Sequence, residues 1–461
     1  MLRKERARAN MIAEMFPAVF TIIAEILFTV AVLAQSGGIV FYRVTQKSGD
    51  HTYFHTEHMD ISVTLIRGIA GLVMITLFLA LLNWWFDLWI MRILLPVNVL
   101  VFCGIMAQAF LKPEGLQKHL LTVLIGLICG VIAVFLVYCP RNSRAFRTIC
   151  NASVAACVVF MIYGQFFKVN GSGISFLGLQ PGELCKLLLL MLCIWGFECL
   201  RTESACRWAY FRSAAAMFLY LLLVNDLGNS LIIAALILIV LCALGRGKLT
   251  AILTALGGAA AIGGSLLLIR LVPSNRLTQR ITQSFFYPVT HWADSSVNQN
   301  LRQSILSIVR GGLLGTGVYS SDPLYASTTY ASYTDFTFAC GTSIFGIGFA
   351  AVILAALAVL VLHVSPTKEQ TQAAYNQLYQ GCILSCLFLV QGFVHILGSL
   401  SAIPMTGVVL PFVSAGGTAM VTSFAAVGCM AGLNLPREKA WGIRQIWARL
   451  TAFGGGKEII P

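Results

Sequence analysis

Residues 119–138 read HLLTVLIGLICGVIAVFLVY, a run that contains no Asp, Glu, Lys or Arg. A helix that crosses a bilayer needs about 20 predominantly apolar residues, so this run predicts a membrane span. Comparable apolar runs recur from residue 13 to residue 433. Because lipid offers no partner for backbone polar groups, each run should be helical. The sequence therefore predicts an all-α, polytopic transmembrane helix bundle.

The composition supports this prediction along the whole chain. Hydrophobic types make up 58% of the 461 residues and charged types 11%, whereas a soluble domain carries about 25% charged residues. A count of ten or eleven spans stays open, because 184–200 is short and only 225–228 separates two runs. We expect about twelve spans, with approximate limits at 13–34, 61–83, 89–111, 119–138, 147–167, 184–200, 208–224, 228–245, 249–271, 337–362, 377–400 and 405–433.

The net charge of +13 is informative through its distribution. With twelve spans the basic clusters fall on one side, and positively charged loops are cytoplasmic. We therefore expect a multi-pass protein of the cytoplasmic membrane with both termini inside, a retained first span, and no nucleic-acid partner. Lys112 and Lys118 are exceptions on the outer side. The clusters are Arg3 to Arg8, Arg141 to Arg147, Arg201 and Arg207, Arg246 and Lys248, Lys368, and Arg437 to Arg449.

One loop, residues 272–336, is much longer than the others and lies outside by the charge argument. A loop of this length is usually functional or disordered. Its aromatic residues, arginines and glycine cluster (311–317) argue against disorder and suit an anionic or sugar-bearing ligand. An amphipathic loop lying on lipid headgroups is the alternative. Asp335 closes the loop, either as a helix N-cap or as a functional carboxylate; the two roles are compatible.

Three further polar segments interrupt the apolar pattern. In 180–186 (QPGELCK), Glu183 and Lys186 are three residues apart and can pair on one helix face, either at a well-formed helix start or beside a substrate groove. Residues 225–229 (NDLGN) suit a tight turn. Residues 404–418 contain two prolines and a Gly-Gly pair within an apolar stretch, which predicts a broken helix that lines a cavity or is buried in protein.

Metal-binding signals are weak. His51, His55, Glu57 and His58 in the first outer loop have a spacing that can hold a metal, but a solvated loop is the simpler interpretation. The 14 cysteines lie mostly within apolar runs without a CxxC pair, as expected of small buried hydrophobes. The sequence therefore predicts no metal site.

Together these segments resemble the SEDS family of membrane glycosyltransferases (FtsW/RodA/SpoVE-like). The resemblance rests on five motifs in order: 180–186, 225–228, the loop with Arg280, Gln303-Ser304 and 311–317, Thr334-Asp335-Phe336, and 404–417. Gln391 also precedes Pro404 at the family spacing. The resemblance divides the chain into N-terminal spans (1–165), a SEDS-like core (166–435) and a basic tail (436–461).

The chain departs from the family pattern in several places. The acidic pair expected after Phe336 is replaced by Ser343 and Ile344, which puts activity and metal use in question more than the fold. Gly182 stands for the usual Ser and Asn225 for the usual Pro. Residues 330–333 replace a proline-containing stretch. About five spans precede 180–186, where the family usually has three.

The resemblance implies a glycan-strand polymerase that uses lipid II as donor and acceptor at the outer face of the bacterial cytoplasmic membrane. It implies Asp335 as base or acceptor-positioning group, Arg280 and Arg302 at the diphosphate, and a class B penicillin-binding protein as partner. It leaves a divalent cation (Mg²⁺ or Mn²⁺) open. The further implied substrate-binding residues are Glu183, Lys186, Gln303, Ser304, Gly312, Thr334, Ser414, Gly416 and Gly417.

Two alternatives belong to other functional classes. A flippase for a lipid-linked sugar fits many spans and broken helices, but few ionisable residues lie deep in the spans; Glu25 and Arg67 are the clearest. A degenerate scaffold for a cell-wall synthase is supported only by Ser343 and Ile344. Polymerisation by purified protein without a membrane gradient separates the enzyme from both.

Overall fold

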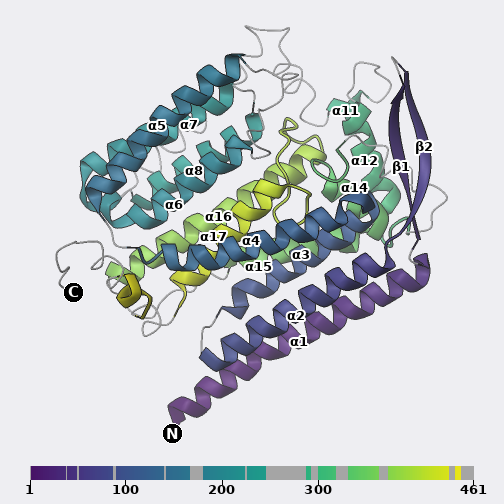
Figure 1. The fold of residues 1–461 in the computed structure, drawn as a ribbon, viewed down its shortest axis with the longest axis horizontal. Helices are drawn as coiled ribbons and strands as arrows, with labels where there is room; N and C mark the ends of the chain where they lie inside the picture. Colours follow the sequence, from purple (N-terminus) through teal and green to yellow (C-terminus); the bar gives the residue numbers. More distant parts are fainter. Residues whose placement is uncertain are drawn as a thin grey trace.

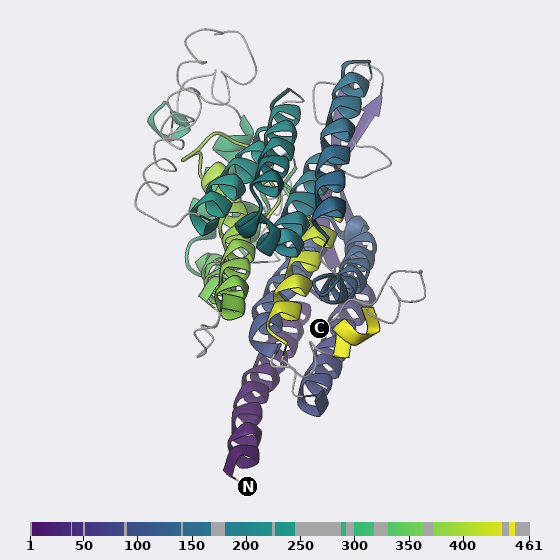
Figure 2. The same ribbon diagram turned by 90° about the vertical axis from the view of Figure 1, so that its left-hand side faces the viewer.

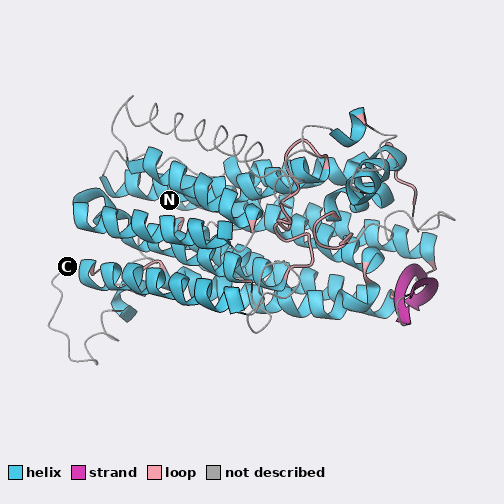
Figure 3. Cartoon of the chain, turned by 90° about the horizontal axis from the view of Figure 1, so that it is seen from above, coloured by secondary structure: helices cyan, strands magenta, loops and turns pink. Residues whose placement is uncertain are grey.

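A computed structural model describes residues 2–37, 39–48, 51–86, 90–139, 142–166, 180–223, 226–244, 287–291, 299–317, 331–362, 372–435 and 442–447. These residues form a bundle of helices that lie roughly along one direction, with a two-stranded hairpin at one end (Figures 1 and 3). In order, the elements are α1 (Leu2–Ser36), β1 (Ile39–Ser48), β2 (His51–Asp60), α2 (Ser62–Phe86), α3 (Met91–Leu111), η1 (Pro113–Gly115), α4 (Leu116–Leu136), α5 (Ser143–Phe166), α6 (Pro181–Thr202), α7 (Ser204–Leu223), α8 (Leu227–Leu244), α11 (Tyr287–Thr290), α12 (Gln299–Gly311), α14 (Thr337–Phe345), α15 (Ile347–Leu362), α16 (Gln372–Ser399) and α17 (Gly417–Leu433).

The bundle has the character of a multi-pass membrane protein. Among the described residues, five helices are long and apolar enough to cross a bilayer: Pro17–Ser36, Ser62–Asn83, Met91–Leu111, Pro113–Leu136 and Gln380–Ser399. Three shorter apolar helices, 228–244, 347–362 and 417–433, accompany them. The outer helices expose large apolar side chains, such as Leu77 and Phe78 on α2 and Ile128 on α4, as expected where lipid is the solvent. The predicted membrane bundle is confirmed.

Two predicted spans are corrected by the structure. The expected span at 337–362 is two helices, because Gly346 adopts φ +79° and ends α14 before α15 begins. The expected span at 405–433 is helical only from Gly417, and 404–416 is a non-helical segment with Phe412 at φ +65°. The break predicted from the prolines and glycines is therefore confirmed, although it is longer than a kink. The expected span at 249–271 lies outside the described residues.

The first outer loop is a β-hairpin. β1 and β2 are antiparallel, with Ile39 opposite Asp60 and Ser48 opposite His51. The residues expected to form a solvated loop are thus part of a strand, with residues 51–60 paired with β1. The metal interpretation concerns the side chains of 51–58, which lie outside the described residues. The hairpin connects the end of α1 to the start of α2, and β1 packs against α3 (Figure 1).

A buried network of polar side chains attaches α1 and α2 to α3. The Asn98 side chain on α3 donates to Glu25 Oε1 on α1 at 2.7 Å, and the Thr76 hydroxyl on α2 lies 2.7 Å from Asn98 Oδ1. Glu25 is 4% exposed and Asn98 7% exposed. Three residues after Glu25, Phe28 on α1 packs against Phe345 at the end of α14, with ring centroids 5.9 Å apart. The N-terminal half of α1 projects beyond its neighbours (Figure 2), and these contacts lie in its C-terminal half.

We expect Asn98→Ala to destabilise the protein by about 1–3 kcal/mol, because a buried acceptor that loses its donor keeps its desolvation cost. Thermal unfolding in detergent, followed by circular dichroism, measures the change. Thr76→Val is the matched control: it removes the outer link but leaves Glu25 its donor, so its effect should be smaller. An Asn98→Ala midpoint equal to the wild type would show that the bond to Glu25 contributes nothing.

Candidate active site

A buried ion pair occupies the start of α6. Lys186 Nζ lies 2.8 Å from Glu183 Oε1, and each side chain is 2% exposed. Thr422 on α17 donates to the other Glu183 oxygen at 3.0 Å, and Lys186 donates to Gln391 Oε1 on α16 at 3.2 Å. The pair predicted from the i,i+3 spacing is confirmed. It joins α6, α16 and α17, which pack against one another (Figure 1).

Pro181 is the first residue of α6, where its missing backbone N–H costs no helical hydrogen bond. Glu183 lies in the first turn, where the helix dipole favours a negative charge.

The neighbouring turn caps α8: Asp226 accepts from the Asn229 backbone at 3.1 Å and from the Asn229 side chain at 3.0 Å. Burial raises the pKa of Asp226, and these hydrogen bonds oppose the rise. A Cβ on Gly182 would lie 2.6 Å from Asp226 Oδ2, so the glycine lets the two helix starts meet.

The non-helical segment 404–416 is held by side chains of neighbouring helices. From α16, Gln391 donates to Val409 O at 3.1 Å and His395 Nδ1 lies 2.7 Å from Val408 O. Within the segment, the Ser414 hydroxyl accepts from the Leu410 backbone at 3.0 Å. Because these carbonyls and amides have no helical partner, the side chains replace the bonds that the break removes. The predicted site residue Ser414 thus stabilises a turn.

Asp335 lies in the turn 331–336, directly before α14. Its amide donates to Ala331 O at 3.0 Å, and its carbonyl accepts from the Ser399 hydroxyl of α16 at 3.4 Å. A Cβ placed on Gly407 would be 3.7 Å from Asp335 Oδ2, so the carboxylate faces the broken segment. The N-cap position of α14 belongs to Phe336. Asp335 therefore does not occupy the N-cap position, and its functional role stays a prediction.

Two residues near the end of α3 that were not predicted as site residues support the same turn. Gln108 donates to Tyr333 O at 3.0 Å and to Val413 O at 3.4 Å, and Ala415 N donates to Tyr333 O at 2.9 Å. The Lys112 ammonium lies 4.0 Å from the Tyr333 ring centroid. The sequence could have pointed to Lys112, because this lysine falls outside the basic clusters that were assigned to the cytoplasmic side. The structure places its ammonium beside the Asp335 turn.

The outer loop contributes α12 and the glycine turn. Ser304 on α12 is buried and donates to Ser399 O at 2.8 Å, while Arg302 and Gln303 beside it are half-buried. After α12, Gly312 adopts φ +52° in an exposed turn. Arg280 lies outside the described residues. Ser304 therefore connects the loop to the helix residue that also binds the Asp335 backbone.

The glycine turn covers the break between α14 and α15. The Thr316 amide donates to Ser343 O at 2.8 Å, and the Gly317 amide donates to Ile344 O at 3.2 Å. Ser343 and Ile344, which occupy the positions of the expected acidic pair, are 2% and 9% exposed. In the described part of the chain no three His, Cys, Asp or Glu side chains gather.

The remaining predicted residues lie at the edges of this arrangement. Thr334 is half-buried in the Asp335 turn and donates to Ala331 O at 3.3 Å. Gly416 occupies the N-cap position of α17, and Gly417 is its first residue. The structure thus brings Asp335, Ser304, Thr334 and 404–416 together at one end of the bundle, with Glu183 and Lys186 joined to them through α16.

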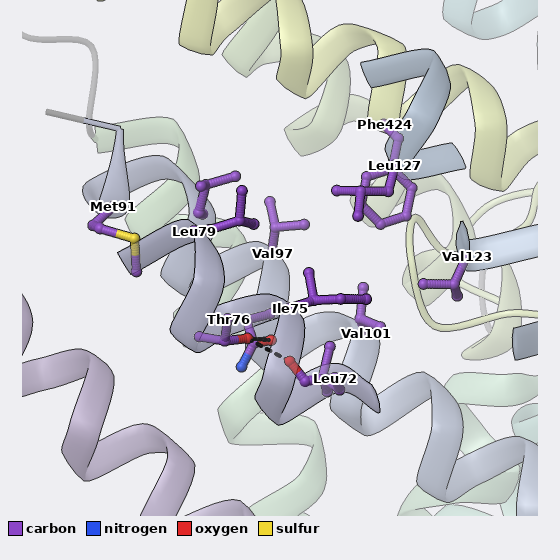
Figure 4. A pocket seen from close by; sticks show the side chains of 12 residues that line it. Leu72, Ile75, Thr76, Leu79, Met91, Val97, Val101, Val123, Leu127 and Phe424 are labelled. Atoms are coloured by element: carbon purple, nitrogen blue, oxygen red, sulfur yellow. Dashed lines mark hydrogen bonds between the residues drawn. The ribbon is translucent and has the colours of Figure 1, made fainter. Parts of the chain in front are cut away.

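A cavity of about 50 Å³ lies elsewhere, between α2, α3, α4 and α17. Figure 4 shows that its lining is mostly apolar; Thr76 and Asn98 are the polar lining residues. The polar side chains of the candidate active site do not line it.

The comparisons with known proteins agree with this geometry. The family model FTSW_RODA_SPOVE, described as "Cell cycle protein", matches residues 110–439. The chain belongs to this family. α1 and α2 precede the matched region, which begins at the end of α3.

Relatives and one solved structure support the assignment. The probable peptidoglycan glycosyltransferase FtsW of Lactococcus lactis is 32% identical over 234 residues, 49% of this chain and 54% of that protein, so the chain spans about half of its length. The Bacillus subtilis protein of the same name is 24% identical over 333 residues, 67% of this chain and 78% of that protein. A solved structure described as "Structural coordination of polymerization and crosslinking by a peptidoglycan synthase complex" aligns over 74% of this chain and 96% of its own, with a TM-score of 0.53 and 19% identity. It shows the shared fold.

We expect Lys186→Met to destabilise the protein by about 3–5 kcal/mol, because Glu183 would keep a buried charge without its cation. Thermal unfolding in detergent measures the loss. The double variant Glu183→Gln/Lys186→Met removes both charges and should recover much of it. Equal midpoints for Lys186→Met and the wild type would contradict a charged, mutually dependent pair.

Proposed function

We propose that this protein polymerises lipid II into glycan strands at the outer face of the cytoplasmic membrane. Family membership and the probable peptidoglycan glycosyltransferases among its relatives support this proposal. The observation that carries it is the placement of Asp335. One half-buried carboxylate lies where a loop helix, a broken membrane segment and α16 meet.

The proposed reaction is a single displacement. The 4-hydroxyl oxygen of the acceptor sugar attacks the anomeric carbon of the donor lipid II, and the bond to undecaprenyl diphosphate breaks. Asp335 takes the hydroxyl proton as general base or orients the hydroxyl. A fixed carboxylate suits this task, because a small misplacement of a reacting group is costly. The result is a β-1,4 bond with inversion.

The leaving diphosphate needs cations. We assign this role to Arg302 and, from the sequence, to Arg280. Lys112 adds a cation on the neighbouring side of the Asp335 turn, where it contacts Tyr333. Glu183 and Lys186 are too deeply buried to be solvated groups, and we assign them to shaping the cavity wall beneath the sugars.

Topology and partners extend this proposal. An outward site requires the ends of α3 and α16 that carry Lys112 and Ser399 to face the exterior, with both chain termini inside. We propose a class B penicillin-binding protein as partner, which would cross-link the new strands. The related solved structure belongs to a peptidoglycan synthase complex, which is consistent with such a partner.

We expect Asp335→Asn to abolish polymer formation from purified lipid II, because the amide keeps the size of the side chain but cannot accept the proton. Gel analysis of glycan strands made by purified protein in detergent measures the change. Ser343→Ala, at a buried position outside the proposed chemistry, is the matched control and should keep activity. Polymer made by Asp335→Asn at the wild-type rate would contradict the assignment. A folded wild type that makes no polymer would favour the scaffold, which Ser343 and Ile344 at the acidic-pair positions also support.

We expect Arg302→Gln to raise the KM for lipid II more than it lowers kcat, since the arginine contacts the diphosphate in both ground and transition states. Steady-state kinetics at varied lipid II concentration separate the two parameters. Arg310→Gln, on the exposed end of the same helix, is the matched control. Unchanged kinetics for Arg302→Gln would remove Arg302 from the diphosphate site.

A further inference from the structure

Three residues of α16, each four positions from the next, bond to backbone outside that helix. Gln391 donates to Val409 O at 3.1 Å, His395 Nδ1 lies 2.7 Å from Val408 O, and Ser399 donates to Asp335 O at 3.4 Å. Residues four apart lie on one face of a helix. This face therefore contacts both the broken segment and the Asp335 turn.

His395 is the middle residue and is 2% exposed. A carbonyl oxygen can only accept, so the bond to Val408 O places a hydrogen on Nδ1. The other ring nitrogen, Nε2, is buried and has no hydrogen-bond partner among the described residues. The contact that holds this ring in place is thus the bond from Nδ1 to the broken segment.

The residue before Val408 is Gly407, which lies beside the Asp335 carboxylate. Gly407 adopts φ +70°, and a Cβ there would be 3.7 Å from Asp335 Oδ2. The His395 bond fixes the peptide that follows Gly407. The Ser399 hydroxyl donates to His395 O at 2.9 Å and lies 3.4 Å from Asp335 O, so the same helix face also contacts the Asp335 backbone. One helix face therefore adjoins both sides of the contact between Gly407 and Asp335.

We propose that His395 is a positioning residue for Asp335. By donating from Nδ1 to Val408 O, His395 holds the Gly407 backbone against the Asp335 carboxylate. This contact keeps the carboxylate in the orientation that meets the acceptor hydroxyl. The role of His395 in the reaction rests on the proposed function. The role of His395 in holding residues 404–416 is independent of the proposed function.

Three substitutions separate the two ring nitrogens. The side-chain amide of Asn can place its N–H near the position of Nδ1, that of Gln places it near Nε2, and Leu supplies neither. We expect His395→Asn to keep kcat within about twofold of the wild type, and His395→Gln and His395→Leu to lower kcat about 10- to 100-fold with little change in KM for lipid II. Size-exclusion profiles and unfolding midpoints in detergent control for folding. If the Leu variant does not fold, comparison of the Asn and Gln variants still distinguishes a role for Nδ1 from a role for Nε2.

Hydrogen–deuterium exchange of the peptide that covers 404–412 supplies a readout independent of activity. The Asn variant should keep the wild-type protection, and the Gln and Leu variants should exchange faster in this peptide. Equal protection and equal kcat in all variants would overturn the proposal, as would an active Gln variant beside an inactive Asn variant, which would assign the function to Nε2. An inactive wild type would overturn the proposed function, and the exchange series would still test the positional claim.

Discussion

A broken backbone inside a membrane bundle must find its hydrogen bonds in protein, because lipid supplies none. Here the break is 404–416, and one polar face of α16 supplies the bonds through Gln391 and His395. The same helix binds the Asp335 turn through Ser399 and the buried Lys186 through Gln391. The irregular segment, the Asp335 turn and the buried Glu183–Lys186 pair thus all contact α16.

This arrangement explains how distant parts of the chain form one site. Ser304 on the loop helix donates to the carbonyl of Ser399, whose hydroxyl lies 3.4 Å from the carbonyl oxygen of Asp335. Gln108 on α3 joins the Asp335 turn to the broken segment from the other side. These contacts, from α12 and α16 on one side and from α3 on the other, hold the Asp335 turn in place when a bulky lipid-linked sugar enters. Proton transfer to a general base requires such a fixed position, because a small misplacement is costly.

Sequence reasoning predicted what local spacing and composition determine. The Glu183–Lys186 pair follows from i,i+3 geometry, and the break in 404–416 follows from its prolines and glycines. The break at Gly346 was missed, because a single glycine in an apolar run has no local signature of positive φ. The hairpin at 39–60 was missed because its charged and histidine residues suggested solvent. Partners such as Gln108 and Ser399 depend on tertiary contacts that spacing along the chain does not encode. The acidic-pair positions, Ser343 and Ile344, proved to be buried beneath the glycine turn.

The N-terminal helices add a layer that the matched family region does not contain. Phe28 of α1 meets Phe345 at the end of α14, ten positions after Asp335, so the added layer reaches the helix that begins at the site. The central claim remains the one-step transfer at Asp335. The most direct test is the configuration at the anomeric carbon of strands made by the purified wild type, determined by NMR against the lipid II donor. The account predicts complete inversion. Retention would require a covalent intermediate and would contradict it.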